Sequence, residues 1–369
     1  MRPYFHRRRH QPEWEAATTA GLRAAEREGE VLARAAMRHG FFLLRRHAGD
    51  IPAALEAVHL ALEGYRRAGF APGEGTILTN LALHYGQRGQ MRHALGWQQA
   101  GIANARSLGR PISLGRGLNM AGLIHSYLGE LDQALVCTIE AIETHVRAGH
   151  RSFVISPRIN RAIAHHSLGR YEEALADGTE ALRLCRSHQQ QHSEAGAHEI
   201  LARIRRDTGR LDLADTHAER ALRRARETGD PADETDCLIT LAGLHRLRGR
   251  PDRAVAYLEE ALRITHRCDF RHQEADARTQ LARARLAAGD TDLASHHGDR
   301  APAIARALEL RPAEHRALTA LAAIARTTGA TAAEAEHTAQ SLRIREETGY
   351  HPSPADESAP VGTPNGTGR

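Results

Sequence analysis

The chain has 369 residues, of which 41% are hydrophobic, 26% are charged and only 4% are aromatic. Its formal net charge of +5 suffices for solubility but is too small to indicate a nucleic-acid-binding protein. No apolar stretch approaches the roughly 18 residues of a membrane span, and charge follows Met1, so we expect neither a span nor a signal peptide. The cysteines share no motif spacing, which is typical of reduced thiols in the cytoplasm.

A glycine recurs every 40 residues, which is the period of a repeat array. This glycine column consists of Gly49, Gly89, Gly129, Gly169, Gly209, Gly249, Gly289 and Gly329. Small residues occupy three more columns in the same frame, at positions five and twelve after the glycine and seven before it. Small side chains at fixed spacing let two antiparallel helices approach closely, because little more than a methyl group separates their backbones.

The first element in chain order is a predicted helix over residues 10–28. In the 40-residue frame it is the second helix of a repeat whose first helix would precede Met1, so residues 1–30 are assigned to a truncated first repeat. Its apolar face would need an upstream domain or a partner chain as a cap; alternatively, the first helix pair has diverged from the pattern. The arginine run in this segment is more typical of a solvated face than of a nucleic-acid-binding arm; it comprises Arg7, Arg8 and Arg9.

Residues 31–349 follow as eight repeats. Their expected bounds are 31–70, 71–110, 111–150, 151–190, 191–230, 231–270, 271–310 and 311–349. Each is predicted to contain a helix of roughly 16 residues, a turn at the column glycine and a second helix of roughly 17 residues. Apolar positions recur at spacings of three and four rather than two, which predicts helices and no strands.

The last repeats follow the pattern least well. Pro302 falls within a predicted helix, where proline costs about 3 kcal/mol unless a kink absorbs it. Glu334 also breaks the small column five residues after the glycine. We expect residues 291–345 to be bent and to be the least stable part of the array. Residues 350–369, rich in proline and small polar residues, are expected to form a disordered tail.

The column pattern resembles the tetratricopeptide repeat. Residues 170–175 (Arg-Tyr-Glu-Glu-Ala-Leu), 180–182 (Glu-Ala-Leu) and 80–82 (Asn-Leu-Ala) match it closely, and the likeness covers essentially residues 31–349. The usual repeat has about 34 residues, so a period of 40 implies extended helices. The resemblance implies an all-α, right-handed α-α solenoid of helix hairpins that binds a peptide or protein partner in its concave groove.

A narrower likeness starts from the opening of the chain. Residues 2–6 (Arg-Pro-Tyr-Phe-His), followed by Glu13 and Trp14, look similar to the C-terminal repeat region of actinobacterial antibiotic regulatory proteins, which are signal-transduction ATPases that regulate transcription. In that family a DNA-binding domain and a nucleotide-binding ATPase precede the repeats. The present sequence has no Gly-x-x-x-x-Gly-Lys-Ser/Thr loop and no lysine. The likeness implies a cytoplasmic regulatory or sensor module, with an upstream nucleotide-binding domain as one candidate partner.

No side-chain pattern predicts a catalytic centre, a metal site or a cofactor. The sequence has no Gly-x-Ser-x-Gly elbow, and no pair of catalytic acids stands out. His188 and His192 have a spacing of four, but they flank Gln189, which replaces a helix-ending glycine, so we expect a polar turn rather than a metal site. A histidine column four residues before the glycine is expected to pack between helices; it holds His125, His165 and His245.

The concave surface is the predicted binding site. In this fold the first helix of each repeat lines the groove. The inward positions of the first repeats hold Asn80, Leu83, Arg116, Asn119, Leu123, Tyr127, Asn160 and His166, and those of the later repeats hold Glu199, Arg203, Arg206, Arg246, Arg283 and Arg326. Asparagine carboxamides donate and accept hydrogen bonds, so they suit an extended peptide backbone, whereas arginines suit carboxylates or phosphates. The structural alternative is that these polar residues only cover a wet surface.

The sequence therefore predicts a non-enzymatic scaffold that binds a peptide or protein segment and acts in signalling or transcriptional regulation. Two alternatives stay open. A regulatory fragment could touch nucleic acid through its basic inner rows, with strongly salt-dependent affinity. An architectural oligomer could instead be held together by the uncapped first helix.

Overall fold

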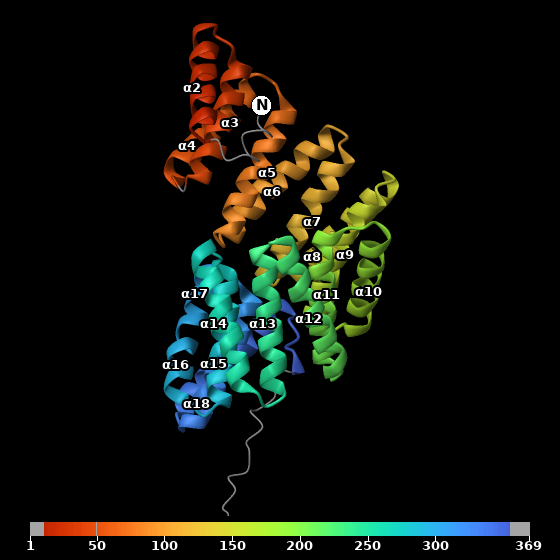
Figure 1. The fold of residues 1–369 in the computed structure, drawn as a ribbon, viewed down its shortest axis with the longest axis vertical. Coiled ribbons are helices and arrows are strands. Elements are labelled where there is room, and N and C mark those ends of the chain that lie inside the picture. Colours follow the sequence, from red (N-terminus) through yellow and green to blue (C-terminus); the bar gives the residue numbers. More distant parts are fainter. Residues whose placement is uncertain (1–10, 49, 355–369) are drawn as a thin grey trace, which may run out of the picture. The chain divides into compact units, whose positions relative to one another are not determined.

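The computed structural model describes residues 11–48 and 50–354, and every regular element within these ranges is a helix (Figure 1). The helices are α2 (Gln11–Arg27), α3 (Val31–His47), α4 (Ile51–Arg67), α5 (Ala71–Gln87), α6 (Met91–Ser107), α7 (Pro111–Leu128), α8 (Leu131–Arg147), the 3-10 helix η1 (Arg151–Val154), α9 (Ile155–Ser167), α10 (Tyr171–Ser187), α11 (Gln191–Asp207), α12 (Leu211–Thr228), α13 (Pro231–Leu247), α14 (Pro251–Cys268), α15 (Arg271–Ala287), α16 (Thr291–Gly298), α17 (Arg300–Ala307), α18 (Arg311–Thr328) and α19 (Thr331–Thr348). The all-α solenoid of helix hairpins is confirmed. The arginine run at residues 7–9 and Gly49 lie outside the described residues.

The chain forms two compact units. The N-terminal unit spans Met1–His84 and Gly96–Gly117, and the C-terminal unit spans Tyr85–Leu95 and Leu118–Arg369. The boundary runs through α5, α6 and α7, so each of these helices contributes residues to both units.

Left-handed residues end the helices at both glycine columns. In the column used to define the repeats, the described glycines from Gly89 to Gly329 have φ between 68° and 83°. A second column, one helix further on, holds six more left-handed glycines, including Gly149 and Gly229. Three residues of this second column are not glycine, yet they keep the same conformation: Gln189, Asp269 and Glu309 have φ of 53°, 56° and 56°. The frame therefore dictates the backbone even where glycine is missing, at a cost in strain.

The small-residue columns lie between the helices, as the spacing predicts. Every alanine of the column that runs from Ala54 to Ala294 is 0% exposed. Gly122 shows how close the approach is, because a Cβ added there would lie 2.7 Å from Thr138 Cγ2 and 3.2 Å from the Ala134 carbonyl oxygen. These columns therefore set the distance between helices along the array.

The expected kink at Pro302 is present, because α16 ends at Gly298 and α17 begins at Arg300. Pro302 has no N–H to offer the carbonyl group of Gly298, four residues earlier. Gly298 packs closely on the next repeat, since an added Cβ would lie 2.9 Å from Leu321 Cδ2. The helix therefore breaks where the proline removes its hydrogen bond, while the low stability of this region stays a prediction.

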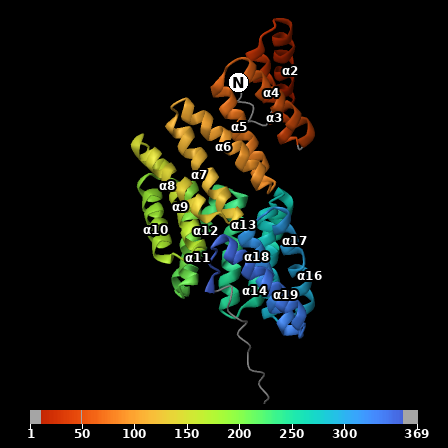
Figure 2. The same ribbon diagram turned by 180° about the vertical axis from the view of Figure 1, so that it is seen from behind.

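The first and last repeats of the C-terminal unit contact each other (Figure 2). A Cβ on Gly129 would lie 2.9 Å from Thr348 Cγ2 and 3.1 Å from Arg311 Cβ. Arg92 forms ion pairs with Glu309, at 3.1 Å, and with Glu130. The helices of this unit therefore wind until its two ends meet, and the inner faces of their first helices enclose a shared interior.

The segment after α19 is packed inside the C-terminal unit. Tyr350 is 5% exposed and Ser353 is 4% exposed. The backbone N–H of His351 donates to the carbonyl oxygen of Ser167 at 2.7 Å, and the Tyr350 ring meets the His315 ring edge-on at 5.2 Å between centroids. Residues 350–354 thus belong to the packed unit, contrary to the expectation of a tail from residue 350. Residues 355–369 lie outside the described residues.

Candidate binding cavity

A cavity of about 160 Å³ lies inside the C-terminal unit, lined by α7, α9, α11, α13, α15, α18 and the segment after α19. On α7 and α9 the lining residues include Tyr127 and His166, which lie two and three residues before their column glycines. On α15 and α18 they include Asp276 and Arg316, thirteen residues before theirs. The cavity therefore passes from the ends of the early helices to the beginnings of the late ones.

Six inward positions named from the sequence line this cavity: Leu123, Tyr127, His166, Glu199, Arg203 and Arg206. The structure brings these side chains together from α7, α9 and α11. The repeat pattern predicts which positions face the concave side. Which of these positions line the same cavity depends on the contact between the first and last repeats of the unit.

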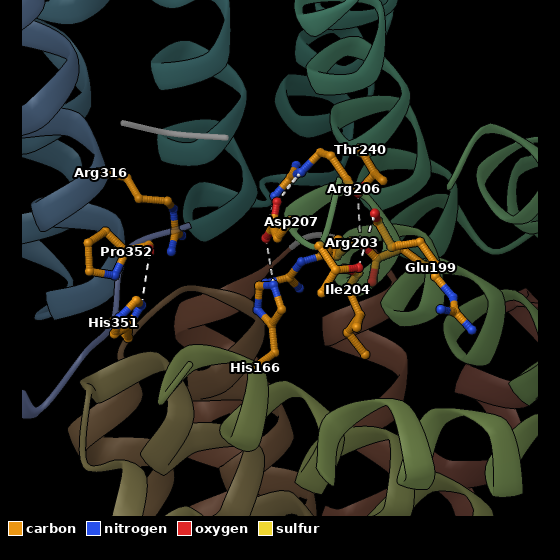
Figure 3. Close-up of polar contacts among 12 residues, drawn as sticks. His166, Glu199, Arg203, Ile204, Arg206, Asp207, Thr240, Arg316, His351 and Pro352 are labelled. Carbon is orange, nitrogen blue, oxygen red and sulfur yellow. Dashed lines mark hydrogen bonds and ion pairs between the residues drawn. The ribbon is translucent and has the colours of Figure 1, made fainter. Parts of the chain in front are cut away.

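A buried charge network joins two residues of the lining, His166 and Arg206, through Asp207 (Figure 3). His166 Nε2 lies 2.7 Å from Asp207 Oδ2, and Arg206 Nε donates to Asp207 Oδ1 at 2.7 Å. Burial alone would raise the pKa of Asp207, but the Arg206 charge and the His166 hydrogen bond outweigh it and hold that pKa well below its usual range. Burial lowers the pKa of His166, so His166 is neutral near pH 7 and donates through Nε2. Its Nδ1 is buried without a hydrogen-bond partner.

Polar contacts between neighbouring repeats recur at a spacing of 41 residues, and sequence reasoning missed them. Three such pairs join the inner faces of successive first helices: Asn80 Nδ2 with His39 Nε2 at 2.8 Å, Asn160 Nδ2 with Asn119 Oδ1 at 2.8 Å, and Thr240 Oγ1 with Glu199 Oε1 at 2.7 Å. In each pair the residue nine before one column glycine meets the residue ten before the preceding one. The sequence contained a signal for these contacts. In these three pairs of neighbouring repeats, which alternate along the array, the position ten before the first glycine and the position nine before the next glycine are both polar.

The inner arginines mostly bind groups of the chain itself. Arg316 Nη2 lies 2.6 Å from Asp276 Oδ1, and Arg283 Nη2 donates to Thr319 Oγ1 at 2.9 Å. Arg326 turns toward the next helix, where its Nε lies 2.7 Å from Glu334 Oε1. Arg203 is less engaged: its Nε lies 3.9 Å from Glu199 Oε1.

The acidic part of the lining lies on α13 and α15 and was not singled out from the sequence. Asp236, thirteen residues before Gly249, is half-buried and accepts a hydrogen bond from Gln273 Nε2 at 2.7 Å. Burial, and after it the charge of Glu199, raises the pKa of Asp236 well above its usual range. His272 packs on Tyr127 with ring centroids 5.2 Å apart, and burial lowers the pKa of His272 to about 4.

The remaining residues named from the sequence do not line the cavity. Asn80, Leu83 and Arg116 belong to the N-terminal unit, where Leu83 is 39% exposed and Arg116 is exposed. Asn119 and Asn160 bind each other, and Arg246 on α13 is half-buried outside the lining. As candidate ligand contacts, these six stay predictions.

Within the described ranges, no group of three or more His, Cys, Asp or Glu side chains is placed to hold a metal ion. None of the helices described is long and apolar enough to cross a membrane. His188 follows the last residue of α10 and His192 lies in the first turn of α11, on either side of the left-handed Gln189, which confirms the predicted turn.

Paired helices stacked in a fixed frame around a concave interior define a tetratricopeptide solenoid. Residues 112–348 match the family model described as the MalT-like TPR region. Because this match covers more than half of the sequence, the chain belongs to the MalT-like TPR family. No curated protein sequence matches the chain.

Several solved structures have a similar fold. A Rap protein complexed with competence and sporulation factor is 12% identical, with a TM-score of 0.66 over 92% of this chain and 97% of that chain. The Rap conjugation gene regulator of plasmid pLS20, in complex with the Phr peptide, is 10% identical, with a TM-score of 0.67 over 92% and 94%. Aspartyl phosphate phosphatase F from Bacillus subtilis is 12% identical, with a TM-score of 0.60 over 77% and 73%. At these identities the likeness shows the fold alone.

Proposed function

We propose that the C-terminal unit binds an extended peptide segment on its concave face, and that the chain acts as a non-enzymatic sensor or regulatory module. The observation that carries the proposal is the segment Tyr350–Ser353. It is not helical, it lines the cavity at Tyr350 and Ser353, and it is part of the same chain. The concave face thus already holds one non-helical segment.

The contacts of this segment are of a kind that other sequences can make. The bond from the His351 N–H to the Ser167 carbonyl oxygen joins two backbones, so it requires no particular side chain. Gly169 permits the close approach, because a Cβ there would lie 2.7 Å from His351 Cγ. A peptide that leaves its own N–H groups free can replace this contact.

The size of the cavity indicates that the segment leaves when a peptide binds. The remaining space of about 160 Å³ is smaller than the roughly 300 Å³ at the lower end of ligand pockets. A peptide of several residues therefore needs the space that Tyr350–Ser353 fills. We propose that the ligand and this segment compete for one surface.

Two further points support a peptide ligand over nucleic acid. Arg206 and Arg316 are paired with Asp207 and Asp276, so little of the inner positive charge is free for phosphates. The two Rap structures named above hold a factor and a peptide. We place the proposed action in cytoplasmic signalling or transcriptional regulation, with a peptide or protein as partner and an upstream nucleotide-binding domain as a second candidate partner.

The test compares the full chain with a chain that ends at Gly349. Both are titrated with a library of random decapeptides, and circular dichroism checks that both are folded. We expect tighter binding, by tenfold or more, to the shortened chain, because no internal segment competes. Equal binding by the two chains would contradict the proposed competition between the peptide and Tyr350–Ser353. Absence of binding to both chains would contradict the peptide-binding function itself.

A further inference from the structure

Among the residues that the structure describes, the Asp236 carboxylate in the cavity forms no ion pair. Asp276 is paired with Arg316 at 2.6 Å, and Glu199 has Arg203 at 3.9 Å and the Thr240 hydroxyl at 2.7 Å. Asp236 accepts only the neutral amide of Gln273, and no described arginine or histidine lies within ion-pair distance of it. A partly buried carboxylate is costly unless a cation or several donors compensate its charge.

Hydrogen-bond acceptors without donors surround the same space. Gln273 is 2% exposed and its Nε2 donates to Ala232 O and to Asp236, but its Oε1 is buried without a partner. His166 is 6% exposed, and its Nδ1 also has no partner. The Nδ1 of His272 is buried and unpartnered as well. All three residues line the cavity, and the two atoms whose role is fixed by chemistry and partners, Gln273 Oε1 and His166 Nδ1, are acceptors that lack a donor.

We propose that the α13–α15 end of the cavity is a subsite for a positively charged donor group of the ligand. Asp236 supplies the carboxyl group, whose charged form the incoming cation stabilises against the effect of burial, and Gln273 Oε1 accepts a second hydrogen bond from the same group. The inference rests on the proposed peptide-binding function and adds the chemistry of one ligand position: an arginine or lysine side chain, or a free amino terminus.

The aromatic wall suits such a group. Tyr127 and His272 line the cavity together, and a cation over the face of a tyrosine ring is attracted by its π electrons. The neutral state of His272 near pH 7, which follows from its burial, avoids a like charge beside the incoming cation. The guanidinium of Arg203 lies 3.9 Å from Glu199 Oε1, and its charge also lowers the pKa of Asp236, although burial outweighs this effect.

The first experiment uses small probes and does not need the natural ligand. Melting temperatures are measured with N-acetyl-arginine amide, glycine amide and N-acetyl-glutamate amide at equal ionic strength, for the full chain and, once circular dichroism shows that it is folded, for the chain ending at Gly349. Protection by the arginine probe assigns a side-chain cation, and protection by glycine amide assigns an amino terminus. Both effects should vanish in Asp236→Asn and persist in Asp212→Asn, whose carboxylate is exposed and pairs with Arg248. Protection by the glutamate probe alone would overturn the proposal.

The second experiment uses acetylated and amidated hexapeptide pools, each with one fixed residue. We expect arginine and lysine pools to bind at least tenfold more tightly than glutamate or leucine pools, and Asp236→Asn to abolish this preference while leaving the leucine pools unchanged. Equal weakening of every pool would show a structural role and overturn the subsite. If no pool binds while the small cations still protect only chains that keep Asp236, the subsite stands and the peptide function fails.

Discussion

The helix interfaces and the cavity of the C-terminal unit follow opposite rules. At the interfaces the same small residue returns in repeat after repeat, and its burial is complete, as in the alanines from Ala54 to Ala294. In the cavity each repeat contributes different side chains, several of them charged and some with unmet hydrogen bonds. Periodic positions therefore hold the array together, whereas the positions that break the period give the cavity its distinct lining.

The comparison is sharpest at the charge network, which includes two residues of the cavity lining, His166 and Arg206, and which we expect to stabilise the framework. Asp207→Ala should lower the free energy of unfolding by about 3–5 kcal/mol, because it removes a buried carboxylate that accepts hydrogen bonds from both Arg206 and His166. Asp212→Ala is the matched control, since this carboxylate is 96% exposed, and it should leave stability unchanged. Denaturant unfolding followed by circular dichroism measures both; similar curves for the two variants would show that the network is not structural.

The dependence of stability on pH distinguishes the cavity from the helix interfaces, because the alanine columns contain no titratable group. The pKa of His272 in the folded chain is about 4, below its ordinary 6.5, so the unfolded chain binds the proton first as pH falls. Stability should therefore decline from pH 6.5 to about 4, by on the order of 3 kcal/mol from this residue. His272→Gln should flatten that part of the profile, while His198, whose pKa is also lowered to about 4, keeps its share. An unchanged profile of unfolding free energy against pH would contradict the burial of His272.

Two helical glycines test the interface rule directly. Gly122→Ala should cost about 1–3 kcal/mol, because the added Cβ meets a backbone oxygen and Thr138. Gly96→Ala should instead gain about 0.5–1 kcal/mol, since nothing lies within 4 Å of a Cβ there and alanine favours the helix. Thermal unfolding of both variants gives the sign; a gain at Gly122 would mean that the helices are not in close contact.

The smallest effect is expected at a strained turn. Gln189 is left-handed in a column where most residues are glycine, so Gln189→Gly should raise the unfolding free energy by about 0.5–1 kcal/mol. The neighbouring Gln190 has φ of −86°, and Gln190→Gly should bring no gain. A loss of stability in Gln189→Gly would show that its side chain matters more than its backbone.

Much of the fold could be predicted from the glycine and alanine columns, because helix spacing and turns depend on local sequence that repeats. The kink at Pro302 followed for the same reason. The site could be predicted only in part: Tyr127, His166, Arg203 and Arg206 were found on inward positions, but Asp236 and Gln273 were not. The proximity of Asp236 and Gln273 to the other lining residues depends on the curvature of the unit. This curvature is the sum of small rotations between successive repeats, which the sequence of one repeat does not reveal. The packing of Tyr350–Ser353 was missed because prolines and small residues are also typical of disorder.

A photo-crosslinking experiment tests the central claim, that the working surface is the cavity of the C-terminal unit. The photoreactive residue p-benzoylphenylalanine replaces Tyr127, which lines the cavity, or Val136, which is 56% exposed on α8. A bound peptide selected from the random library should crosslink at position 127, more strongly when the chain ends at Gly349, and should not crosslink at position 136. Crosslinking at position 136 with none at position 127 would contradict the account.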